Sequence, residues 1–197
     1  MKKLLLVLLA LPFIGFGQTA EEYFNKAYDY AENEQYQLAI DNYTSALKIN
    51  PDDAYAYYNR GSAYGELKNY TAAIADYTSA LKINPDDAKA YYNRGNAYDE
   101  LKNYTAAIAD YTSALRINSD YAKAYYNRGY AYEKLKNYTA AIADYTSALR
   151  INPDLAEAYM NRGITKENAG QSYCSDYKRA CDLGKEECCE WYYKQCK

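Results

Sequence analysis

A repeat of 34 residues restricts the folds open to this chain more than any other feature. The segment Ala54–Asp87 recurs at 88–121 and again at 122–155, and a more divergent copy occupies 20–53. The first two of the three similar copies are identical at 28 of 34 positions, and the last two at 29 of 34. A fixed period of this length is typical of stacked helical hairpins, in which each copy is one supersecondary unit. The sequence therefore predicts an array of hairpins.

Within one copy, apolar and small residues fall at helical spacing on two stripes. Leu67, Lys68 and Asn69 form the turn between the stripes, and Pro85 ends the second helix because proline cannot continue the helical hydrogen-bond ladder. We predict an all-α fold of antiparallel helix pairs. The stripes are Tyr57, Gly61 and Tyr64, then Tyr70, Ala73, Ile74, Tyr77, Ala80 and Leu81.

These residues carry a family resemblance. The pattern Tyr57, Gly61, Tyr64, Ala73, Tyr77, Ala80 and Pro85 resembles the tetratricopeptide repeat, with tyrosines at its large aromatic positions. It covers four copies, 20–53, 54–87, 88–121 and 122–155. The resemblance implies a right-handed superhelical solenoid whose first helices line a concave groove for peptides or protein partners. The family's carboxylate clamp for chaperone tails is not expected, because its first-helix lysine position holds Phe24, Tyr58, Tyr92 or Tyr126.

A fifth copy begins at Ala156 and departs from the pattern after Gly163. Asp176–Cys181 aligns with Asp76–Leu81 only if two residues are removed, so we expect the first helix or the turn of this copy to be short. A last helix, roughly Glu186–Gln195, is expected to cap the stack. Residues 156–197 are thus interpreted as a degenerate fifth repeat and a cysteine-rich capping helix.

All five cysteines lie in this cap. Cys174 and Cys181 are seven residues apart, as are Cys189 and Cys196. If the chain turns at Gly184-Lys185, one antiparallel register pairs Cys174 with Cys196 and Cys181 with Cys189. Disulfides are expected in an oxidising compartment, and zinc is the weaker alternative, since the chain has no histidine or Cys-x-x-Cys pair. The remaining Cys188 is either free, or links two chains in a dimer, or replaces Cys189 in its bridge.

The N-terminus reads as a secretory signal. Two lysines precede an apolar run from Leu4 to Phe16, and small residues occupy positions 15 and 17, Gly15 and Gly17. The run is too short to span a bilayer, which takes about 20 apolar residues. We predict a signal peptide at 1–17 and a periplasmic or secreted mature chain without membrane insertion. Gln18 at the new N-terminus and the cysteine-rich end resemble exported bacterial proteins of the Bacteroidetes type.

Charge and composition exclude several functions. Removal of 1–17 takes away two lysines, so the formal net charge changes from −3 to −5. An acidic chain is a poor match for nucleic acid, whose binding depends on basic side chains that neutralise phosphates. The absence of histidine removes the commonest general base and metal ligand. We expect no enzyme activity, no cofactor and no metal.

The three similar copies differ in their first helix at only four positions. Thr71, Ala72, Ala75, Thr78 and Ser79, which we expect on the convex surface, are unchanged in all three. Drift at exposed sites is one explanation of the differences, and diversification of a groove explains better why they avoid the convex side. The varying sets are Tyr55/Lys89/Lys123, Ser62/Asn96/Tyr130, Gly65/Asp99/Glu133 and Glu66/Glu100/Lys134.

A tyrosine and an asparagine of the first helix do not vary. The amide of asparagine can pair with an extended peptide backbone, and tyrosine offers a large contact face at low entropic cost. Alternatively, these residues pack between adjacent first helices. The predicted groove residues are Tyr58, Asn59, Ser62, Lys89, Tyr92, Asn93, Asn96, Asp99, Lys123, Tyr126, Asn127, Tyr130 and Glu133.

Each arginine that follows the asparagine has an aspartate on the second helix of its own copy, as Arg60 has Asp76. The first copy has Lys26 and Asn42 instead, and this joint loss predicts an ion pair between the two helices. The function that fits best is a binding module for a protein or peptide. A structural brace in an envelope assembly is the alternative, and a glycan or small-ligand binder is a third.

Overall fold

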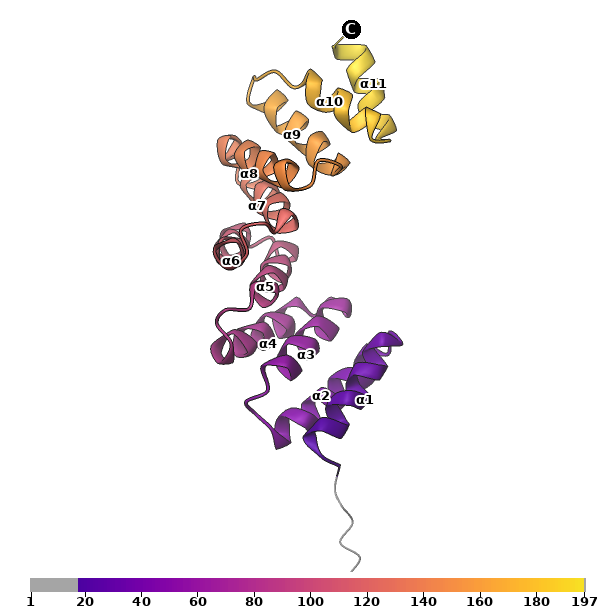
Figure 1. Ribbon diagram of the computed structural model, residues 1–197, viewed down its shortest axis with the longest axis vertical. Helices are drawn as coiled ribbons and strands as arrows, with labels where there is room; N and C mark the ends of the chain where they lie inside the picture. Colours follow the sequence, from indigo (N-terminus) through magenta and orange to yellow (C-terminus); the bar gives the residue numbers. More distant parts are fainter. Residues whose placement is uncertain (1–17, 197) are drawn as a thin grey trace, which may run out of the picture.

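The computed structural model describes residues 18–196, which form eleven α-helices and no β-strand (Figure 1). The predicted all-α class is thereby confirmed, while the predicted signal peptide, residues 1–17, lies outside the described residues. The helices are α1 Ala20–Glu32, α2 Tyr36–Ile49, α3 Ala54–Glu66, α4 Tyr70–Ile83, α5 Ala88–Glu100, α6 Tyr104–Ile117, α7 Ala122–Lys134, α8 Tyr138–Ile151, α9 Ala156–Asn168, α10 Cys174–Asp182 and α11 Glu186–Gln195.

Local sequence fixes the ends of each helix. In the second copy, the side chain of Asp53 accepts a hydrogen bond from the backbone N–H of Ala56 and so caps α3. Lys68 adopts a left-handed conformation with φ of 58°, which reverses the chain after α3. Asn69 then caps α4 by accepting from the N–H of Ala72. The Asn-Tyr-Thr triplet therefore marks the start of α4, α6 and α8, whereas in the first copy the same triplet, 42–44, lies inside α2.

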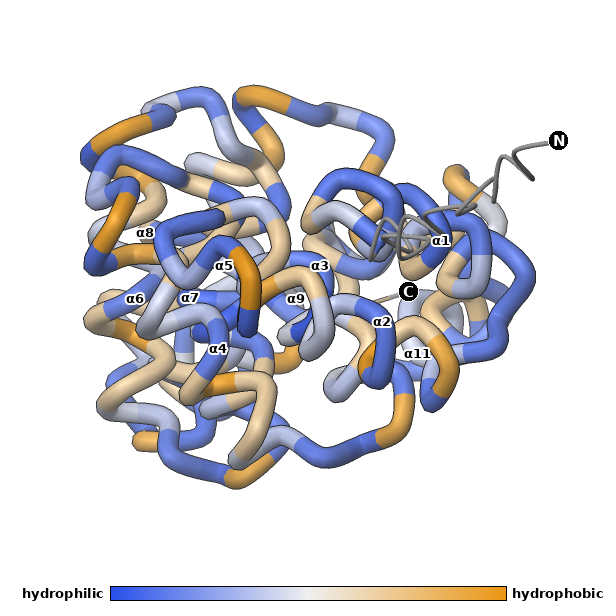
Figure 2. Tube along the Cα trace, turned by 90° about the horizontal axis from the view of Figure 1, so that it is seen from below, coloured by the Kyte–Doolittle hydropathy of each residue, from blue (hydrophilic) through white to orange (hydrophobic). Residues whose placement is uncertain are grey.

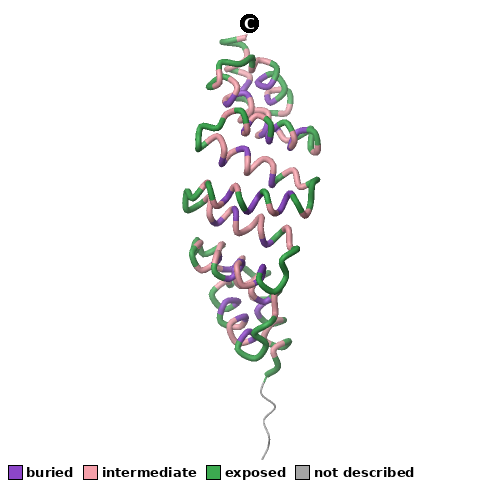
Figure 3. The backbone as a smooth tube through the Cα atoms, turned by 90° about the vertical axis from the view of Figure 1, so that its left-hand side faces the viewer, coloured by how far each residue is buried: buried purple, intermediate pink, exposed green. Residues whose placement is uncertain are grey.

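Two helices of a pair approach closely where the sequence places glycine. A Cβ built on Gly95 would lie 2.7 Å from the ring of Tyr111, and one on Gly61 would lie 3.1 Å from the ring of Tyr77. The fully buried alanines Ala73 and Ala107 lie on the second helices. Figure 3 shows the result, with buried positions inside the zigzag of helices and exposed positions at the turns.

The pairs stack into a solenoid in which each second helix packs on the next first helix, as α4 does on α5. Successive first helices also contact one another, α1 with α3 and α3 with α5. In a view along the long axis the pairs overlap as turns of one coil, and hydrophobic residues do not gather on one side (Figure 2). No helix within residues 18–196 is long and apolar enough to cross a bilayer.

An arginine–aspartate ion pair recurs in four copies. Its arginine also donates a hydrogen bond to the preceding copy and so connects the two. The guanidinium of Arg94 donates to both carboxylate oxygens of Asp110, at 2.7 and 2.8 Å, and its third nitrogen donates to Thr78 of the preceding second helix at 2.9 Å. Arg60, Arg128 and Arg162 make the same contacts. The interhelical pairing predicted from the sequence is confirmed, and the threonine is a partner that the sequence reading missed.

The fifth pair differs from the expectation in where it is shortened. Its first helix, α9, keeps the 13 residues of the other first helices. Its second helix, α10, has nine residues instead of 14, and the connection 169–173 is longer than the usual turn. The first turn of the second helix is what is missing. Lys166, which replaces a tyrosine, pairs with Asp176 at 2.8 Å.

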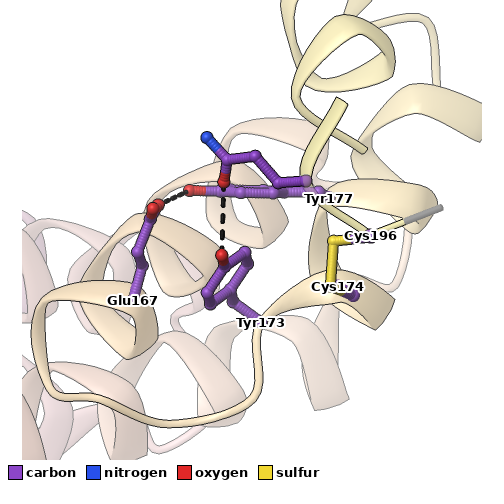
Figure 4. The surroundings of a disulfide bond; sticks show 6 residues. Glu167, Tyr173, Cys174, Tyr177 and Cys196 are labelled. Atoms are coloured by element: carbon purple, nitrogen blue, oxygen red, sulfur yellow. Dashed lines mark hydrogen bonds between the residues drawn. A yellow bond between two sulfur atoms is a disulfide. The ribbon is translucent and has the colours of Figure 1, made fainter. Parts of the chain in front are cut away.

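The cap ends in α11, whose bounds agree with the predicted Glu186–Gln195. Disulfides join Cys174 to Cys196 and Cys181 to Cys189, the register that the spacing indicated. Around the first bond, Tyr173 donates to Gln195 and Tyr177 donates to Glu167 (Figure 4).

The fifth cysteine, Cys188, is free and fully buried. A thiol in this position cannot reach a second chain unless the cap opens, so the dimer considered from the sequence is not supported. Its neighbour Cys189, and not Cys188, forms the bridge to Cys181.

Candidate functional site: the concave groove

The surface formed by the first helices is hollowed. A cavity of about 790 Å³ is lined by residues from three consecutive copies, among them Tyr28 on α1, Tyr55 and Tyr58 on α3, and Lys89 and Tyr121 of the third copy. Tyr55 is 72% exposed, so a large aromatic face is open to the groove. The rings of Tyr121 and Tyr92 lie 4.7 Å apart. Tyr121 and Tyr28 are distant in sequence, and their meeting in one hollow shows that this face is concave.

Hydroxyl groups converge at this hollow. Burial, followed by the nearby hydroxyls of Tyr92 and Tyr58, raises the pKa of Tyr121 to about 12. Burial and the nearby Asp87 carboxylate also raise the pKa of Tyr58. These tyrosines stay neutral at physiological pH and present both donors and acceptors. Tyr28 and Tyr121 were absent from the predicted groove residues, whereas Tyr55 belongs to one of the four varying sets of the first helix.

The predicted asparagines connect adjacent first helices by hydrogen bonds. Asn93 donates its amide to the hydroxyl of Tyr58 in the preceding copy at 2.8 Å, and Asn127 donates to Tyr92 at 3.1 Å. The alternative of packing between adjacent first helices therefore describes these side chains. Asn59 has no such partner, because the first copy has Phe24 where the others have tyrosine.

The varying positions also have an internal role. The second helix of each copy carries a buried tyrosine whose hydroxyl needs a partner. In three copies a varying position supplies it, since Ser62 contacts the hydroxyl of Tyr77 and Asn96 and Glu133 accept from Tyr111 and Tyr145 at 2.9 and 3.0 Å. Groove variation and internal hydrogen bonding are therefore not independent. Thr78 also has an internal role, because its hydroxyl accepts a hydrogen bond from the guanidinium of Arg94. Its constancy in the three copies is therefore no evidence of how freely exposed positions on the convex surface change.

The remaining predicted residues are more open. Lys89 and Lys123 are exposed, and Tyr130 is half-buried with the ammonium of Lys134 over its ring at 4.5 Å. Asp99 lines a hollow of about 420 Å³ with Tyr126 and Tyr130. One of its oxygens is buried without a hydrogen-bond partner, and desolvation raises the pKa of Asp99 to about 6, with a smaller contribution from Glu100.

Candidate metal ligands do not cluster in the described part of the chain. No group of three or more histidine, cysteine, aspartate or glutamate side chains within residues 18–196 is arranged to hold a metal ion. The groove instead offers aromatic faces, amides and a few charges. Such a surface is suited to binding.

Comparisons with known proteins agree with this architecture. The sequence matches the family described as Tetratricopeptide repeat at 54–87, 88–121 and 122–155, and a related family described as TPR repeat at 27–68. No curated protein matches.

Solved structures resemble the chain in fold. The crystal structure of MamA protein has a TM-score of 0.81 at 24% identity, covering 85% of this chain and 93% of that one. MamA 41-end from Desulfovibrio magneticus RS-1 has a TM-score of 0.76 at 21% identity, covering 91% and 98%. YrrB, a TPR protein with an unusual peptide-binding site, has a TM-score of 0.76 at 21% identity, covering 84% and 86%.

Proposed function

Because this chain belongs to the tetratricopeptide-repeat family, we propose that it is a non-enzymatic scaffold that binds an extended segment of a partner protein in its concave groove. The observation that carries the proposal is the hollow lined by three consecutive copies, with exposed Tyr55 and Lys89 at its wall. Large aromatic side chains and few charges at a concave surface are typical of peptide contact. YrrB, which shares the fold, has a peptide-binding site.

The site has a fixed floor and an adaptable wall. The floor is made by hydrogen bonds between copies, such as Asn93 to Tyr58, which hold the first helices in register. The wall is made by positions that differ between copies, Tyr55, Lys89 and Lys123. A partner segment running along the groove would meet tyrosine in the second copy and lysine in the third and fourth, which gives selectivity along its length.

We also propose that the protein works outside the cytoplasm. The predicted signal peptide at 1–17 and the two disulfides of the cap support export to the periplasm or beyond, since disulfides persist in oxidising compartments. In this proposal the mature chain consists of four repeats at 20–155 followed by the degenerate fifth repeat and cap at 156–197.

The proposal is tested by site-specific photo-crosslinking in cells that produce the protein. A benzoylphenylalanine residue replaces Tyr55 or Lys89 in the groove, or Thr105 on the second helix α6 as the matched exposed control. These positions are preferred to Tyr92 or Asn127, whose removal would also break a bond between copies. We expect crosslinks to one partner segment from the two groove positions alone. Equal crosslinking from Thr105, or crosslinking from Thr105 only, would favour the structural brace.

A further inference from the structure

Two small hollows lie between successive first helices at the N-terminal end of the groove, and their linings correspond position by position. The first, of about 210 Å³, is lined by Tyr28, Glu32, Tyr36, Tyr43, Asn59 and Glu66. The second, of about 260 Å³, is lined by the equivalent Ser62, Glu66, Tyr70, Tyr77, Asn93 and Glu100. Glu66 therefore lines both hollows.

The glutamates form an unpaired acidic row. Glu32, Glu66 and Glu100 are exposed at the C-terminal ends of α1, α3 and α5, and none makes an ion pair within residues 18–196. Desolvation, then the charge of Glu100 and a hydrogen bond with its carboxylate, and then the charge of Glu66 raise the pKa of Tyr70, so both carboxylates lie near the same hydroxyl. The row ends at the next copy, where the equivalent residue is Lys134.

A buried hydroxyl without a partner lies in the first hollow. Tyr43 is fully buried and its hydroxyl has no hydrogen bond. The equivalent tyrosines of the other four copies all have a first-helix partner, Ser62, Asn96, Glu133 or Glu167. The Tyr43 hydroxyl lies close enough to Tyr28 and Glu32 that, after burial, they are the groups that raise the pKa of Tyr43. An unpaired buried polar group costs about 1–3 kcal/mol, so its retention here indicates a partner that arrives from outside.

We propose that the two hollows bind basic side chains of an extended segment, one lysine or arginine in each, and this inference rests on the proposed function. The paired carboxylates attract the cation, and the hydroxyl of Tyr43 and the free amide oxygen of Asn59 accept its N–H groups in the first hollow. Packed helices lie about 8–10 Å apart, and an extended segment in the polyproline II conformation advances about 3.1 Å per residue with three residues per turn, so every third side chain faces the same side. The two basic residues are therefore three positions apart, and acidic segments are repelled from this end of the groove.

Selection from an unbiased peptide display library on the purified protein tests the inference, with washing at about 0.15 M salt to suppress long-range attraction. We expect enriched peptides to carry lysine or arginine at i and i+3. Fluorescence anisotropy with a labelled synthetic copy of the most enriched peptide then gives Kd. Glu66→Gln, which affects both hollows, should weaken binding about fivefold or more, and Glu32→Gln or Glu100→Gln less.

Control variants separate this inference from general charge attraction. Glu190→Gln removes the same charge from the exposed face of α11 and should leave Kd unchanged. Lys134→Glu extends the row by one copy and should tighten binding of a peptide with a third basic residue at i+6. Tyr43→Phe, which removes no hydrogen bond from the free protein, should weaken binding without lowering stability.

The outcomes distinguish the two proposals. Enriched peptides that lack basic pairs but lose binding in Tyr55→Ala would overturn this inference and leave the groove as the binding site. Equal effects of Glu66→Gln and Glu190→Gln, or no enrichment at all, would overturn the inference, and the crosslinking experiment would decide the proposed function separately. An unchanged Kd in Tyr43→Phe would overturn the assignment of the first hollow.

Discussion

Replacing Asp110 by asparagine tests the ion pair that connects the repeats. Asp110 is 5% exposed and accepts two hydrogen bonds from Arg94, whose side chain is 17% exposed. Removing one partner of a buried pair costs about 3–5 kcal/mol, because the other charge is left desolvated. The asparagine keeps one acceptor oxygen and the guanidinium keeps its bond to Thr78, so we expect a loss of about 2–3 kcal/mol.

The assay is urea unfolding followed by far-ultraviolet circular dichroism, with midpoint and slope fitted together because repeat arrays can unfold in steps. The matched control is Asp120→Asn, an exposed carboxylate without an ion pair, which should change stability by less than about 0.5 kcal/mol. Arg94→Lys combined with Asp110→Asn recreates the pair found in the first copy, Lys26 and Asn42. We expect the loss of unfolding free energy in the double variant to be smaller than the sum of the two single losses by about 1 kcal/mol or more. Equal losses in Asp110→Asn and Asp120→Asn, or an additive cycle, would refute the reasoning.

Three further predictions concern single positions. Folding raises the pKa of Asp99 from 3.8 to about 6, because its charged form is disfavoured in the folded state. The protein therefore loses stability as the pH rises from about 4 to about 6, and Asp99→Asn, which carries no charge, should avoid this loss. Allowing for its half-exposed position, we expect a gain of about 1–2 kcal/mol in thermal or urea unfolding at pH 7.5 that disappears below pH 4, and an equal gain at both pH values would contradict it. Gly95→Ala should cost about 2 kcal/mol or more in urea unfolding, since its Cβ would meet a ring at 2.7 Å, whereas Gly65→Ala, with nothing within 4 Å, should stabilise by about 0.5–1 kcal/mol. Removing the Cys174–Cys196 bond, which spans 22 residues, should cost about 3 kcal/mol and increase hydrogen exchange in the cap first, and uniform exchange along the array would argue against a local role.

Much of the fold follows from the sequence because the repeat compares the chain with itself. Gly61 and Tyr77 recur together in the three similar copies and lie in close contact, and the joint loss of the arginine and aspartate in the first copy indicates an ion pair. The position of shortening in the fifth copy was not predictable, because an alignment gap of two residues does not say which element absorbs it. The structure places it at the start of α10, where the disulfides hold a short helix that lacks a full first turn.

The candidate site was harder to predict, and the reason is physical. A side chain on the concave face of a solenoid also lies beside its neighbours in the stack, so one position can serve both a partner and the fold. Asn96 and Glu133 vary as groove residues would, yet each accepts a hydrogen bond from a buried tyrosine of its own copy. Sequence differences locate such positions without saying which demand selected them. Only the geometry shows that Lys89 and Lys123 are open.

The first copy lacks several of the interactions that hold the other copies together. It lacks the arginine clamp, it lacks the tyrosine that would hold Asn59, and its own buried hydroxyl at Tyr43 has no partner. The stability of a stacked array is close to a sum of terms within copies and between neighbours, so a copy with fewer such bonds and one exposed end opens most easily. The opposite end has two disulfides. An occupant of the first hollow would supply the missing partners where the array is weakest, and by mass action it would stabilise that copy in proportion to its occupancy. If the first hollow is occupied as proposed, binding and folding are coupled most strongly at the N-terminal end of the groove, where the glutamates make no ion pair among the described residues.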